Sequence, residues 1–377
     1  MTAGEPLLPE QPDRHRVYRG LVTSRQERNF NRILVVVVVL YAASWVGAWV
    51  EVWRERDRPT TFGNPQIAAA APKPPPVPAL ADRVLLPAPS ARVAPALTDA
   101  MRQLIEPLRG QSGELRFAPT LPGETVVDDD ASPAAAGVTA PAATGIHKLT
   151  VEMNKVTSAV EDISIVTLVP RAQKRAGRIG NYTVGTWPWE QGGTPRSPRY
   201  APPRGFIEVT RENQNFDVSE HFRLRDFLTK DQQNVWPKYL VLDPLLIDKL
   251  ELTIQELQRQ GVKVTHVHVM SGFRTPRYNH AGGNTAGRAS LSRHMYGDAA
   301  DVYVDNNRDG QPDDITGDGR VTVRDAERFA QAAEIVERNH RSLVGGIGVY
   351  VACCGHGPFT HVDVRGVRAR WRGTGNG

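Results

Sequence analysis

The sequence predicts an α+β fold for the C-terminal part of the chain, and three patterns support this prediction. Apolar residues recur at helical spacing in one segment, at Leu246, Leu250, Ile254 and Leu257. Residues 262–270 alternate between apolar and polar, and residues 359–364 form a second strand-like run. We expect this α+β domain over residues 213–377, after a β-rich domain, a disordered linker and one transmembrane helix.

The N-terminal segment has the pattern of a membrane anchor. Residues 33–50 contain no charged side chain, and about 20 apolar residues span a bilayer. Arginines precede this run and tryptophans lie at its far end: Arg14, Arg16, Arg19, Arg25, Arg28 and Arg32, then Trp45, Trp49 and Trp53. The positive-inside rule therefore predicts a cytoplasmic N-terminus over 1–32 and a transmembrane helix over 33–53. A cleaved signal peptide is the alternative, although its apolar region is normally only about 7 to 15 residues.

Export determines how the charge of the chain is interpreted. The formal net charge is +5, which in an intracellular protein would suggest nucleic acid as a partner. A domain on the far side of the inner membrane does not routinely meet nucleic acid, so we expect none. An anionic cell-wall polymer and a solvated basic surface without a partner both remain open.

Residues 54–144 have the composition of a linker. They are rich in proline and alanine, which favours an extended, disordered spacer without a packed core. A short helix is expected over 97–106, because Pro107 stops it. Over 145–212, short runs of β-branched and aliphatic residues are bounded by proline and glycine, which predicts a small β-rich accessory domain of the sandwich type.

Within residues 213–377 a helix or helix-rich segment is expected first, over 218–228. A longer helix follows, with Asp243 and Pro244 as its N-cap and first residue and Gly261 at its end. The strand after it places His266 and His268 on one face. We expect these histidines to be hydrogen-bonded rather than metal-bound, because a complete ligand set occurs elsewhere.

That ligand set consists of His294, Asp301 and His361, which come from two separated segments. A catalytic zinc site uses three protein ligands of this kind and leaves a fourth position for water. Gly297 permits a sharp turn before Asp301 enters a strand over 302–304. The sequence therefore predicts a zinc hydrolase.

Longer motifs around these residues resemble a known family. Ser271-Gly272-Phe273-Arg274-Thr275, then Ser292-x-His294-x-x-Gly297-x-Ala299-x-Asp301 and a C-terminal His361, are similar to the zinc D-Ala-D-Ala carboxypeptidase and murein endopeptidase family, which in turn resembles the hedgehog signalling domain. The likeness covers roughly residues 215–372. It implies a zinc domain with an antiparallel sheet that acts on peptidoglycan stem peptides. The run from Gly345 to Tyr350 and Trp371 favour the wall-peptidase branch.

The resemblance also implies roles in catalysis. In this family a Glu or His shortly before the last metal ligand transfers the proton, and His356 is the candidate here. Asp363 is the second candidate for the base, and an orienting role beside His361 is equally open. Arg274 resembles the family arginine that stabilises an oxyanion or binds a peptide carboxylate, with a structural ion pair as the alternative.

Two further features carry weaker signals. The adjacent Cys353 and Cys354 exclude a disulfide framework, and a metal or redox role, plain packing and a vicinal disulfide are all open. The insertion after Asp301 resembles an EF-hand or dockerin loop, in which oxygen ligands alternate before a glycine. Its candidate calcium residues are Asp314, Thr316, Asp318, Arg320 and Asp325. One bound calcium ion and a solvated acidic turn both fit this pattern.

The sequence as a whole predicts a single-pass protein of the inner membrane whose periplasmic domain is a zinc metallopeptidase. Peptidoglycan stem peptides are the expected substrate, and the type is that of a murein endopeptidase or D,D-carboxypeptidase. The alternative from another class is a catalytically inactive protein that keeps the metal and binds peptidoglycan or acts as a scaffold.

Overall fold

The computed structural model describes residues 83–85, 106–127, 138–153, 156–283, 285, 288–353 and 355–373. All of them belong to one compact unit, residues 75–377. No helix in this described part is long and apolar enough to cross a membrane. The cytoplasmic segment and transmembrane helix predicted over 1–53 lie outside the described residues, as does most of the short helix expected over 97–106.

The first sheet has the strand order β1-β5-β6-β2. Its strands are β1 (Arg83–Leu85), β2 (Phe117–Thr120), β5 (Gly145–Met153) and β6 (Val156–Thr167). β5 and β6 form an antiparallel hairpin. β1 pairs in parallel with β5 on one side of it, and β2 pairs in parallel with β6 on the other. A separate hairpin joins β3 (Thr125–Val127) and β4 (Val138–Thr139). The strands of residues 145–212 are divided between this sheet and smaller separate sheets, where the sequence predicted one small domain of the sandwich type.

The disordered linker predicted over 54–144 does not extend to residue 144. A 3-10 helix at Glu106–Arg109 precedes β2, and the side chains of Leu115 and Phe117 are buried in the core. The backbone amides of Gln111 and Ser112 donate to the carboxylate of Asp248, at 2.7 and 2.9 Å. Composition could not predict these contacts, because they join residues more than a hundred positions apart in the sequence.

A second, three-stranded sheet has the order β11-β10-β7, with β7 at Val169–Pro170, β10 at Gly205–Val209 and β11 at Lys238–Leu240. The two-stranded β8 (Arg178–Ile179) and β9 (Tyr182–Thr183) and the 3-10 helices Arg171–Gln173 and Pro198–Tyr200 connect β7 to β10. β10 pairs with β11, so hydrogen bonds link segments on both sides of the boundary predicted at residue 212.

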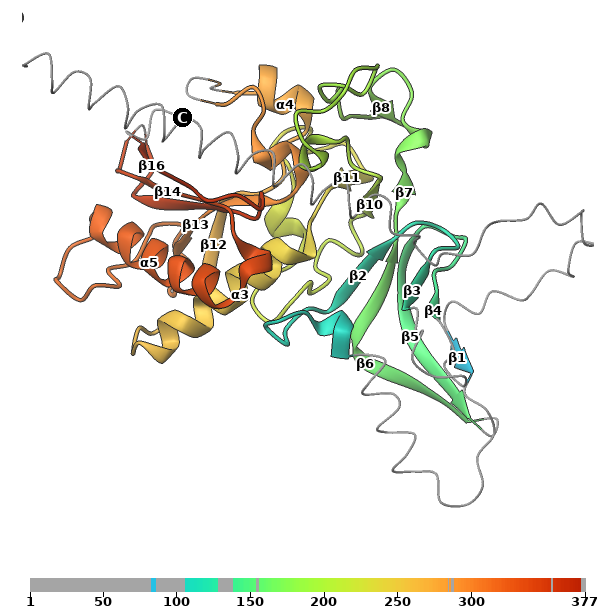
Figure 1. The fold of residues 1–377 in the computed structure, drawn as a ribbon, viewed down its shortest axis with the longest axis horizontal. Coiled ribbons are helices and arrows are strands. Elements are labelled where there is room, and N and C mark those ends of the chain that lie inside the picture. Colours follow the sequence, from blue (N-terminus) through green and yellow to red (C-terminus); the bar gives the residue numbers. More distant parts are fainter. Residues whose placement is uncertain are drawn as a thin grey trace, which may run out of the picture. The chain divides into compact units, whose positions relative to one another are not determined.

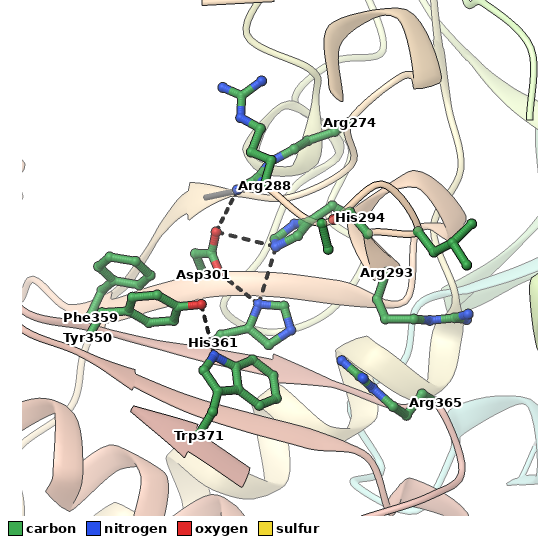
Figure 2. Close-up of a pocket in the computed structure, with 13 residues that line it drawn as sticks. Arg274, Arg288, Arg293, His294, Asp301, Tyr350, Phe359, His361, Arg365 and Trp371 are labelled. Atoms are coloured by element: carbon green, nitrogen blue, oxygen red, sulfur yellow. Dashed lines mark hydrogen bonds and ion pairs between the residues drawn. The ribbon is translucent and has the colours of Figure 1, made fainter. Parts of the chain in front are cut away.

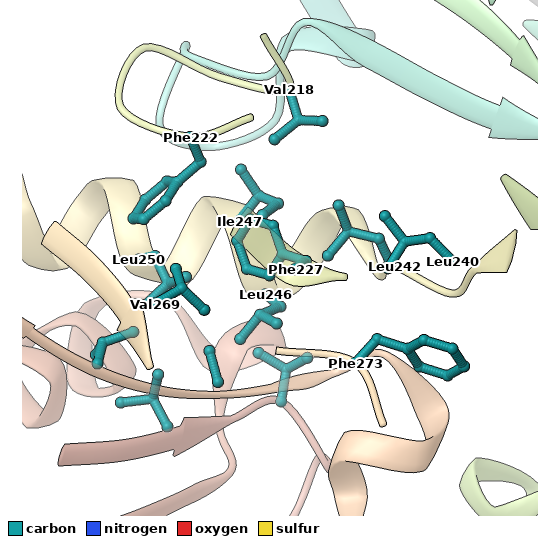
Figure 3. Packing of buried hydrophobic residues seen from close by; sticks show 14 of the residues in the cluster. Val218, Phe222, Phe227, Leu240, Leu242, Leu246, Ile247, Leu250, Val269 and Phe273 are labelled. Carbon is teal, nitrogen blue, oxygen red and sulfur yellow. The ribbon is translucent and has the colours of Figure 1, made fainter. Parts of the chain in front are cut away.

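The prediction of a helix or helix-rich segment over 218–228 is wrong. This segment is a loop with a single 3-10 turn at Leu224–Phe227. Its apolar side chains are nevertheless buried, and the rings of Phe222 and Phe227 lie 5.7 Å apart between their centroids. Figure 3 shows them against Ile247 and Leu250 of the neighbouring helix. The apolar residues of this segment are thus spaced for burial in a loop, and they do not form one face of a helix.

The site is carried by a five-stranded sheet of order β12-β13-β15-β14-β16. Its strands are β12 (Val267–Ser271), β13 (Ala299–Val304), β14 (Gly346–Tyr350), β15 (Phe359–Asp363) and β16 (Ala369–Gly373). The antiparallel arrangement implied by the family holds for the first four strands. It is wrong for β16, which follows the expected last strand and pairs in parallel with β14.

The longer helix that the sequence predicts begins at the predicted residue, and two further helices belong to this domain. α3 spans Pro244–Arg259, and the carboxylate of Asp243 caps it by accepting from the amide of Leu245 at 2.9 Å. α5 spans Val323–Asn339 and begins with a capping box between Thr322 and Asp325. The short helix α4 (Pro276–Ala281) and the 3-10 helices Arg293–Tyr296 and Arg341–Leu343 complete the domain.

The two faces of the five-stranded sheet have different environments. Ala300, Val302 and Val304 are buried on the face that α3 and α5 cover (Figure 1). The Thr360 hydroxyl on this face donates to the carbonyl of Ala326 in α5, at 2.8 Å. Because side chains alternate along a strand, Asp301 and Tyr303 point to the opposite face. The polar residues of the sheet therefore gather on the side away from the helices.

Candidate active site

The structure brings His294, Asp301 and His361 together on that polar face (Figure 2). His361 Nδ1 lies 2.8 Å from Asp301 Oδ1, and His294 Nε2 lies 3.3 Å from Asp301 Oδ2. The two imidazole nitrogens, His294 Nε2 and His361 Nδ1, are 3.2 Å apart. The relative exposures of the three residues are 3%, 5% and 6%. Two imidazole nitrogens and both oxygens of one carboxylate, all atom types that zinc prefers, thus lie close together, and the three residues form a compact, buried triangle.

The size of this triangle fits a zinc ion. Zinc binds histidine nitrogen and carboxylate oxygen at about 2.0–2.2 Å in tetrahedral geometry, which separates neighbouring ligand atoms by roughly 3.3–3.5 Å. The two nitrogens are 3.2 Å apart, and they lie 2.8 and 3.3 Å from different oxygens of Asp301, so small side-chain shifts would bring both nitrogens and one oxygen to this spacing. The three side chains present therefore match the donor set and the dimensions of the predicted metal site.

Local backbone structure places each of the three side chains. Asp301 and His361 are directly paired neighbours on β13 and β15. His294 lies on the 3-10 helix Arg293–Tyr296, which ends at Gly297 in the left-handed conformation with φ 72°. A Cβ at Gly297 would lie 2.3 Å from the carbonyl oxygen of Val241, so only glycine fits this turn. The sharp turn that the sequence predicted at Gly297 is confirmed.

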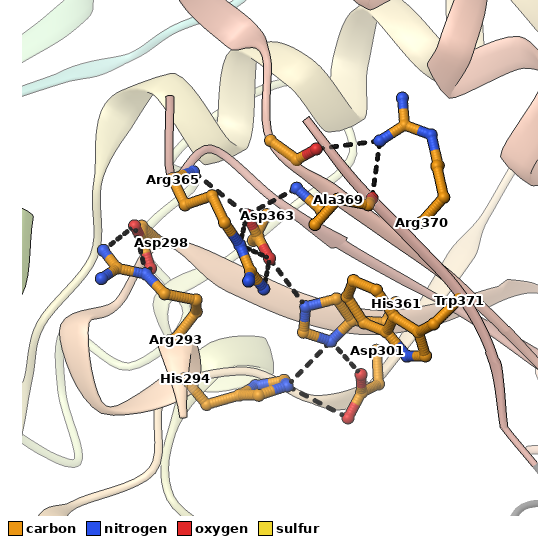
Figure 4. Close-up of polar contacts among 12 residues, drawn as sticks. Arg293, His294, Asp298, Asp301, His361, Asp363, Arg365, Ala369, Arg370 and Trp371 are labelled. Atoms are coloured by element: carbon orange, nitrogen blue, oxygen red, sulfur yellow. Dashed lines mark hydrogen bonds and ion pairs between the residues drawn. The ribbon is translucent and has the colours of Figure 1, made fainter. Parts of the chain in front are cut away.

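Further hydrogen bonds orient both imidazoles, and Figure 4 shows those of His361 with Asp363 and of Asp363 with Arg365. His294 Nδ1 donates to the carbonyl of Gly272 at 2.7 Å. His361 Nε2 donates to Asp363 Oδ2 at 3.1 Å, and Asp363 also accepts from Arg365 and from the amide of Gly346. These contacts occupy the rear nitrogens and turn His294 Nε2 and His361 Nδ1 towards Asp301. Outer contacts of this kind fix the tautomer of metal-binding histidines.

The electrostatics of the triangle follow from its burial. Burial lowers the pKa of His294 to about 4, and the Arg274 guanidinium adds to the shift, so the imidazole is neutral near pH 7. Burial raises the pKa of Asp301, but His294, His361 and Arg274 together hold it well below the usual range. Burial lowers the pKa of His361, but hydrogen bonds to Asp301 and Asp363 raise it overall. The carboxylate is therefore anionic and surrounded by groups that stabilise its charge.

Arg274, the predicted oxyanion or carboxylate binder, contacts the triangle directly. Its Nη2 donates to Asp301 Oδ2 at 2.8 Å, and its Nε donates to Ser271 Oγ at 2.8 Å. The guanidinium also lines the cavity next to the site. The ion pair that the sequence left as the alternative is thus present, and the same side chain faces the space where a substrate would lie.

A cavity of about 400 Å³ opens on the triangle. Cationic and aromatic side chains line it: Arg274, Arg288, Arg293, Arg365, Tyr350, Phe359 and Trp371. The rings of Tyr350 and Phe359 stack at 4.5 Å, and the Trp371 indole donates to the Tyr350 hydroxyl at 2.8 Å. No local motif in the sequence indicated Arg288. Arg293 follows the motif serine and precedes His294, and that adjacency is the signal that could have identified it.

The two candidates for the catalytic base have different surroundings. His356 does not line the cavity, but its ring packs edge-on against Phe359, which does, with centroids 5.1 Å apart. Its Nδ1 donates to the carbonyl of Gly357 at 2.8 Å. Asp363 is fully buried, and although burial opposes the shift, His361 and Arg365 hold its pKa well below the usual range. A carboxylate held in this way favours the orienting role for Asp363.

The calcium loop and the cysteines do not join this site. Asp325 accepts from the amides of Ile315 and Thr316, and Asp314 accepts from the amides of Gly317 and Gly319. Among the described residues, the carboxylates of Asp314, Asp318 and Asp325 do not form a group of three that could hold an ion, so calcium binding by these residues with Thr316 and Arg320 stays a prediction. Cys353 is disulfide-bonded, and the only other cysteine, Cys354, lies outside the described residues.

One comparison with known proteins gives a match. A family model of the peptidase M15 type, described as peptidoglycan L,D-endopeptidase MepK, matches residues 207–310. This range contains His294 and Asp301, and His361 lies beyond its end. The match supports a peptidase domain of this type, and the structure adds the third member of the triangle from outside the matched range. No curated protein and no solved structure matches the chain.

Proposed function

We propose that this protein is a zinc-dependent peptidoglycan peptidase that cleaves stem-peptide bonds in the cell envelope, with L,D-endopeptidase as the reaction type. The observation that carries the proposal is the buried triangle of His294, Asp301 and His361 at the edge of a cavity. The description of the matching family as an L,D-endopeptidase supports the choice of bond. Of the two types predicted from the sequence, we therefore propose the murein endopeptidase and not the D,D-carboxypeptidase.

Each residue of the site has a role in this proposal. A zinc ion held by the triangle would supply a Lewis acid and a bound water of lowered pKa. Gly272 and Asp363 hold the two imidazoles so that their lone pairs face the ion. Arg274 balances the charge of Asp301 and presents a guanidinium to the developing oxyanion of the peptide.

A proton must also move from the attacking water to the leaving amine. We assign this step to His356, because it is the histidine shortly before His361 and its ring packs against Phe359, which lines the cavity. The ring would have to swing past Phe359 to reach the cavity. Substitution of this histidine should therefore lower kcat by about 10² to 10⁴, which is the usual contribution of a general acid–base group.

The lining of the cavity suits a carboxylate-rich peptide. Stem peptides carry free carboxylates. Arg293 and Arg365 already donate to Asp298 and Asp363. The guanidinium of Arg288 donates only to the carbonyls of Tyr278 and Gly282 among the described residues, so it is the cation of this lining that can pair with a substrate carboxylate. The stacked Tyr350 and Phe359 offer an apolar wall for the aliphatic part of the chain. The zinc-loaded enzyme should consequently prefer substrates with these carboxylates over their amidated forms.

The proposed location rests on the sequence pattern alone. An uncleaved helix over 33–53 with arginines before it would anchor the protein in the inner membrane and place the catalytic domain in the periplasm, where peptidoglycan lies. The proline-rich segment after it would extend the reach of the domain towards the wall.

A second candidate is a metal-binding protein that binds peptidoglycan without cleaving it. One observation favours it: in the described part of the chain, Asp301 is the only carboxylate that lines the cavity, and the proposed base His356 does not line it. A site without a proton acceptor would still bind the metal and peptidoglycan but would cleave peptide bonds slowly.

Digestion of defined muropeptides separates these candidates. The purified chain is incubated with L,D-cross-linked and D,D-cross-linked muropeptides, with and without a chelator, and the products are identified by mass spectrometry. We expect cleavage of the L,D cross-link that is lost with chelator and with His294→Ala and retained with His280→Ala, a matched change of an exposed histidine outside the site. Unchanged muropeptides in every sample, with binding retained, would support the scaffold.

A further inference from the structure

A second group of histidines and a carboxylate lies on the same polar face of the sheet. It consists of His266 and His268, which flank the start of β12, and Asp305, which follows the end of β13. β12 and β13 are antiparallel, and the pairing of Val267 with Val304 and of His268 with Tyr303 brings His266 opposite Asp305. Two loops that are almost forty residues apart in the sequence thus meet at one end of the sheet.

The three side chains offer ligand atoms that all lie within 4.8 Å of one another. His268 Nδ1 is 3.9 Å from Asp305 Oδ2, and the His268 ring stacks on Tyr303 with centroids 4.9 Å apart. A tetrahedral ion would draw the ligand atoms to about 3.3–3.5 Å. The required shift of roughly 1.5 Å is within the range of side-chain torsions for two half-buried imidazoles.

The ring nitrogens of these histidines are not held by hydrogen bonds within the described residues, although His268 stacks on Tyr303. The sequence predicted that they would be hydrogen-bonded, and this is wrong: within the described residues neither imidazole forms a hydrogen bond. Asp305, in contrast, is 1% exposed and fixed, because its carboxylate accepts from the amides of Asp309 and Gly310 at 3.0 and 3.1 Å. A buried anion held in place next to two unoccupied imidazoles is a typical beginning of a metal site.

We propose that His266, His268 and Asp305 bind a second divalent transition-metal ion, with zinc as the best match to two imidazoles and one carboxylate. Imidazole and carboxylate donors in this number suit first-row divalent ions. The group opens into a cavity of about 460 Å³, which leaves room for water at a fourth position. Four further carboxylates line this cavity and outnumber its three arginines: Asp217, Glu220, Asp226 and Asp309 against Arg223, Arg225 and Arg308.

The second ion would act on the fold and not on the substrate. It would connect the edge strand β12 to the segment that follows β13, where Asp305 anchors the turn to Gly310. Positions four residues apart on a strand are separated by roughly 13 Å, so Asp305 lies at about this distance from Asp301 on the same strand. A metal here would fix the end of the strand that carries the central ligand of the first triangle.

Zinc counting tests this proposal with the full chain. The purified protein is saturated with zinc, freed of excess by gel filtration, and analysed for zinc per chain by mass spectrometry of the metal. We expect two zinc ions in the wild type, one in His268→Ala and one in Asp305→Asn, and two in the matched control His280→Ala. Circular dichroism verifies the fold of each variant.

The same measurement distinguishes this proposal from the proposed function, on which it does not rest. A zinc ion that is retained in His294→Ala and lost when His268→Ala is added supports the second site, whether or not the protein cleaves muropeptides. One ion in the wild type that persists in His268→Ala would overturn the proposal. The absorption spectrum of cobalt bound to His294→Ala gives a second readout. We expect the bands of four-coordinate cobalt in this variant, and we expect them to vanish when His266→Ala is added. A His294→Ala protein without these bands would contradict the second site.

Discussion

The two histidine and carboxylate groups share one face of one sheet but differ in how far the protein has prepared them. In the first, the ligand atoms are 2.8–3.3 Å apart and all three residues are buried. In the second, the atoms lie within 4.8 Å and both histidines are only half-buried. The first group thus has nearly the dimensions of a bound ion, whereas the second needs side-chain movement to reach them.

The outer contacts explain this difference. Both imidazoles of the first group donate their rear nitrogen to a fixed acceptor, the carbonyl of Gly272 or the carboxylate of Asp363. In the second group only the carboxylate is held, by the amides of Asp309 and Gly310. Preorganised ligands lose less side-chain entropy when they bind. We therefore expect the first group to bind zinc more tightly than the second.

The largest effect should come from His294→Ala. This change removes one of three ligands from the buried triangle, so activity on L,D-cross-linked muropeptides should fall to the level of the chelator-treated wild type. His268→Ala should cause a smaller loss, because it acts only through the end of β13. Rates from product quantification compare the two. Equal losses in both variants would mean that the groups do not have the separate roles assigned to them.

Asp363→Asn should have the next largest effect. The amide cannot serve as an anionic acceptor for His361 and Arg365, and loss of such an outer partner typically lowers metal affinity or activity by about 10 to 100-fold. Zinc competition with a chromophoric chelator measures the change. Asp318→Asn, at an exposed position of the predicted calcium loop, is the matched control and should leave zinc affinity unaltered. Unaltered affinity in Asp363→Asn would remove the orienting role.

Gly348→Ala should have a moderate effect on the cavity. A Cβ there would lie 2.3 Å from the Trp371 ring, which packs beside His361 at 5.1 Å between centroids. Overpacking of this kind costs about 1–3 kcal/mol. Thermal unfolding should show this loss, and KM should rise. Trp371→Leu removes the clashing ring, so Gly348→Ala should lower stability less in this background than in the wild type. An equal loss of stability in both backgrounds would show that the strain does not arise from Trp371.

The smallest effect concerns His221, a histidine that lines the second cavity but already has a partner. Its Nδ1 donates to Glu251 at 2.7 Å, and this hydrogen bond raises its pKa against the opposing effect of burial. The stabilisation is fully present below the unfolded pKa of about 6.5 and is lost as the pH rises through the folded value. His221→Gln should therefore lower Tm more at pH 5.5 than at pH 8.5 and keep the zinc count. A larger loss at pH 8.5 would contradict this sign.

The sequence made the first group recognisable because its residues lie in local motifs. His294, Gly297 and Asp301 are close in the chain, and the resemblance to the zinc carboxypeptidase and endopeptidase family added His361 as the last ligand. Helices α3 and α5 were also predictable, since their caps are local signals. Asp363 was found beside His361 for the same reason.

The second group depends on long-range pairing and was therefore missed. Nothing in the sequence states that His266 lies opposite Asp305, because the register of β12 against β13 includes an irregularity between Val269 and Ser271. Arg288 and strand β16 were missed for a related reason: their places are set by tertiary contacts. The apolar spacing over 218–228 predicted a helix, although those side chains are buried from a loop.

Anomalous diffraction at the zinc edge from crystals of the zinc-loaded protein tests the central claim most directly. We predict a strong peak at about 2.0–2.2 Å from His294 Nε2, His361 Nδ1 and one oxygen of Asp301. A weaker peak should appear between His266, His268 and Asp305. Crystals that contain zinc but show no peak at the first position would contradict the assignment of the buried triangle as the metal centre.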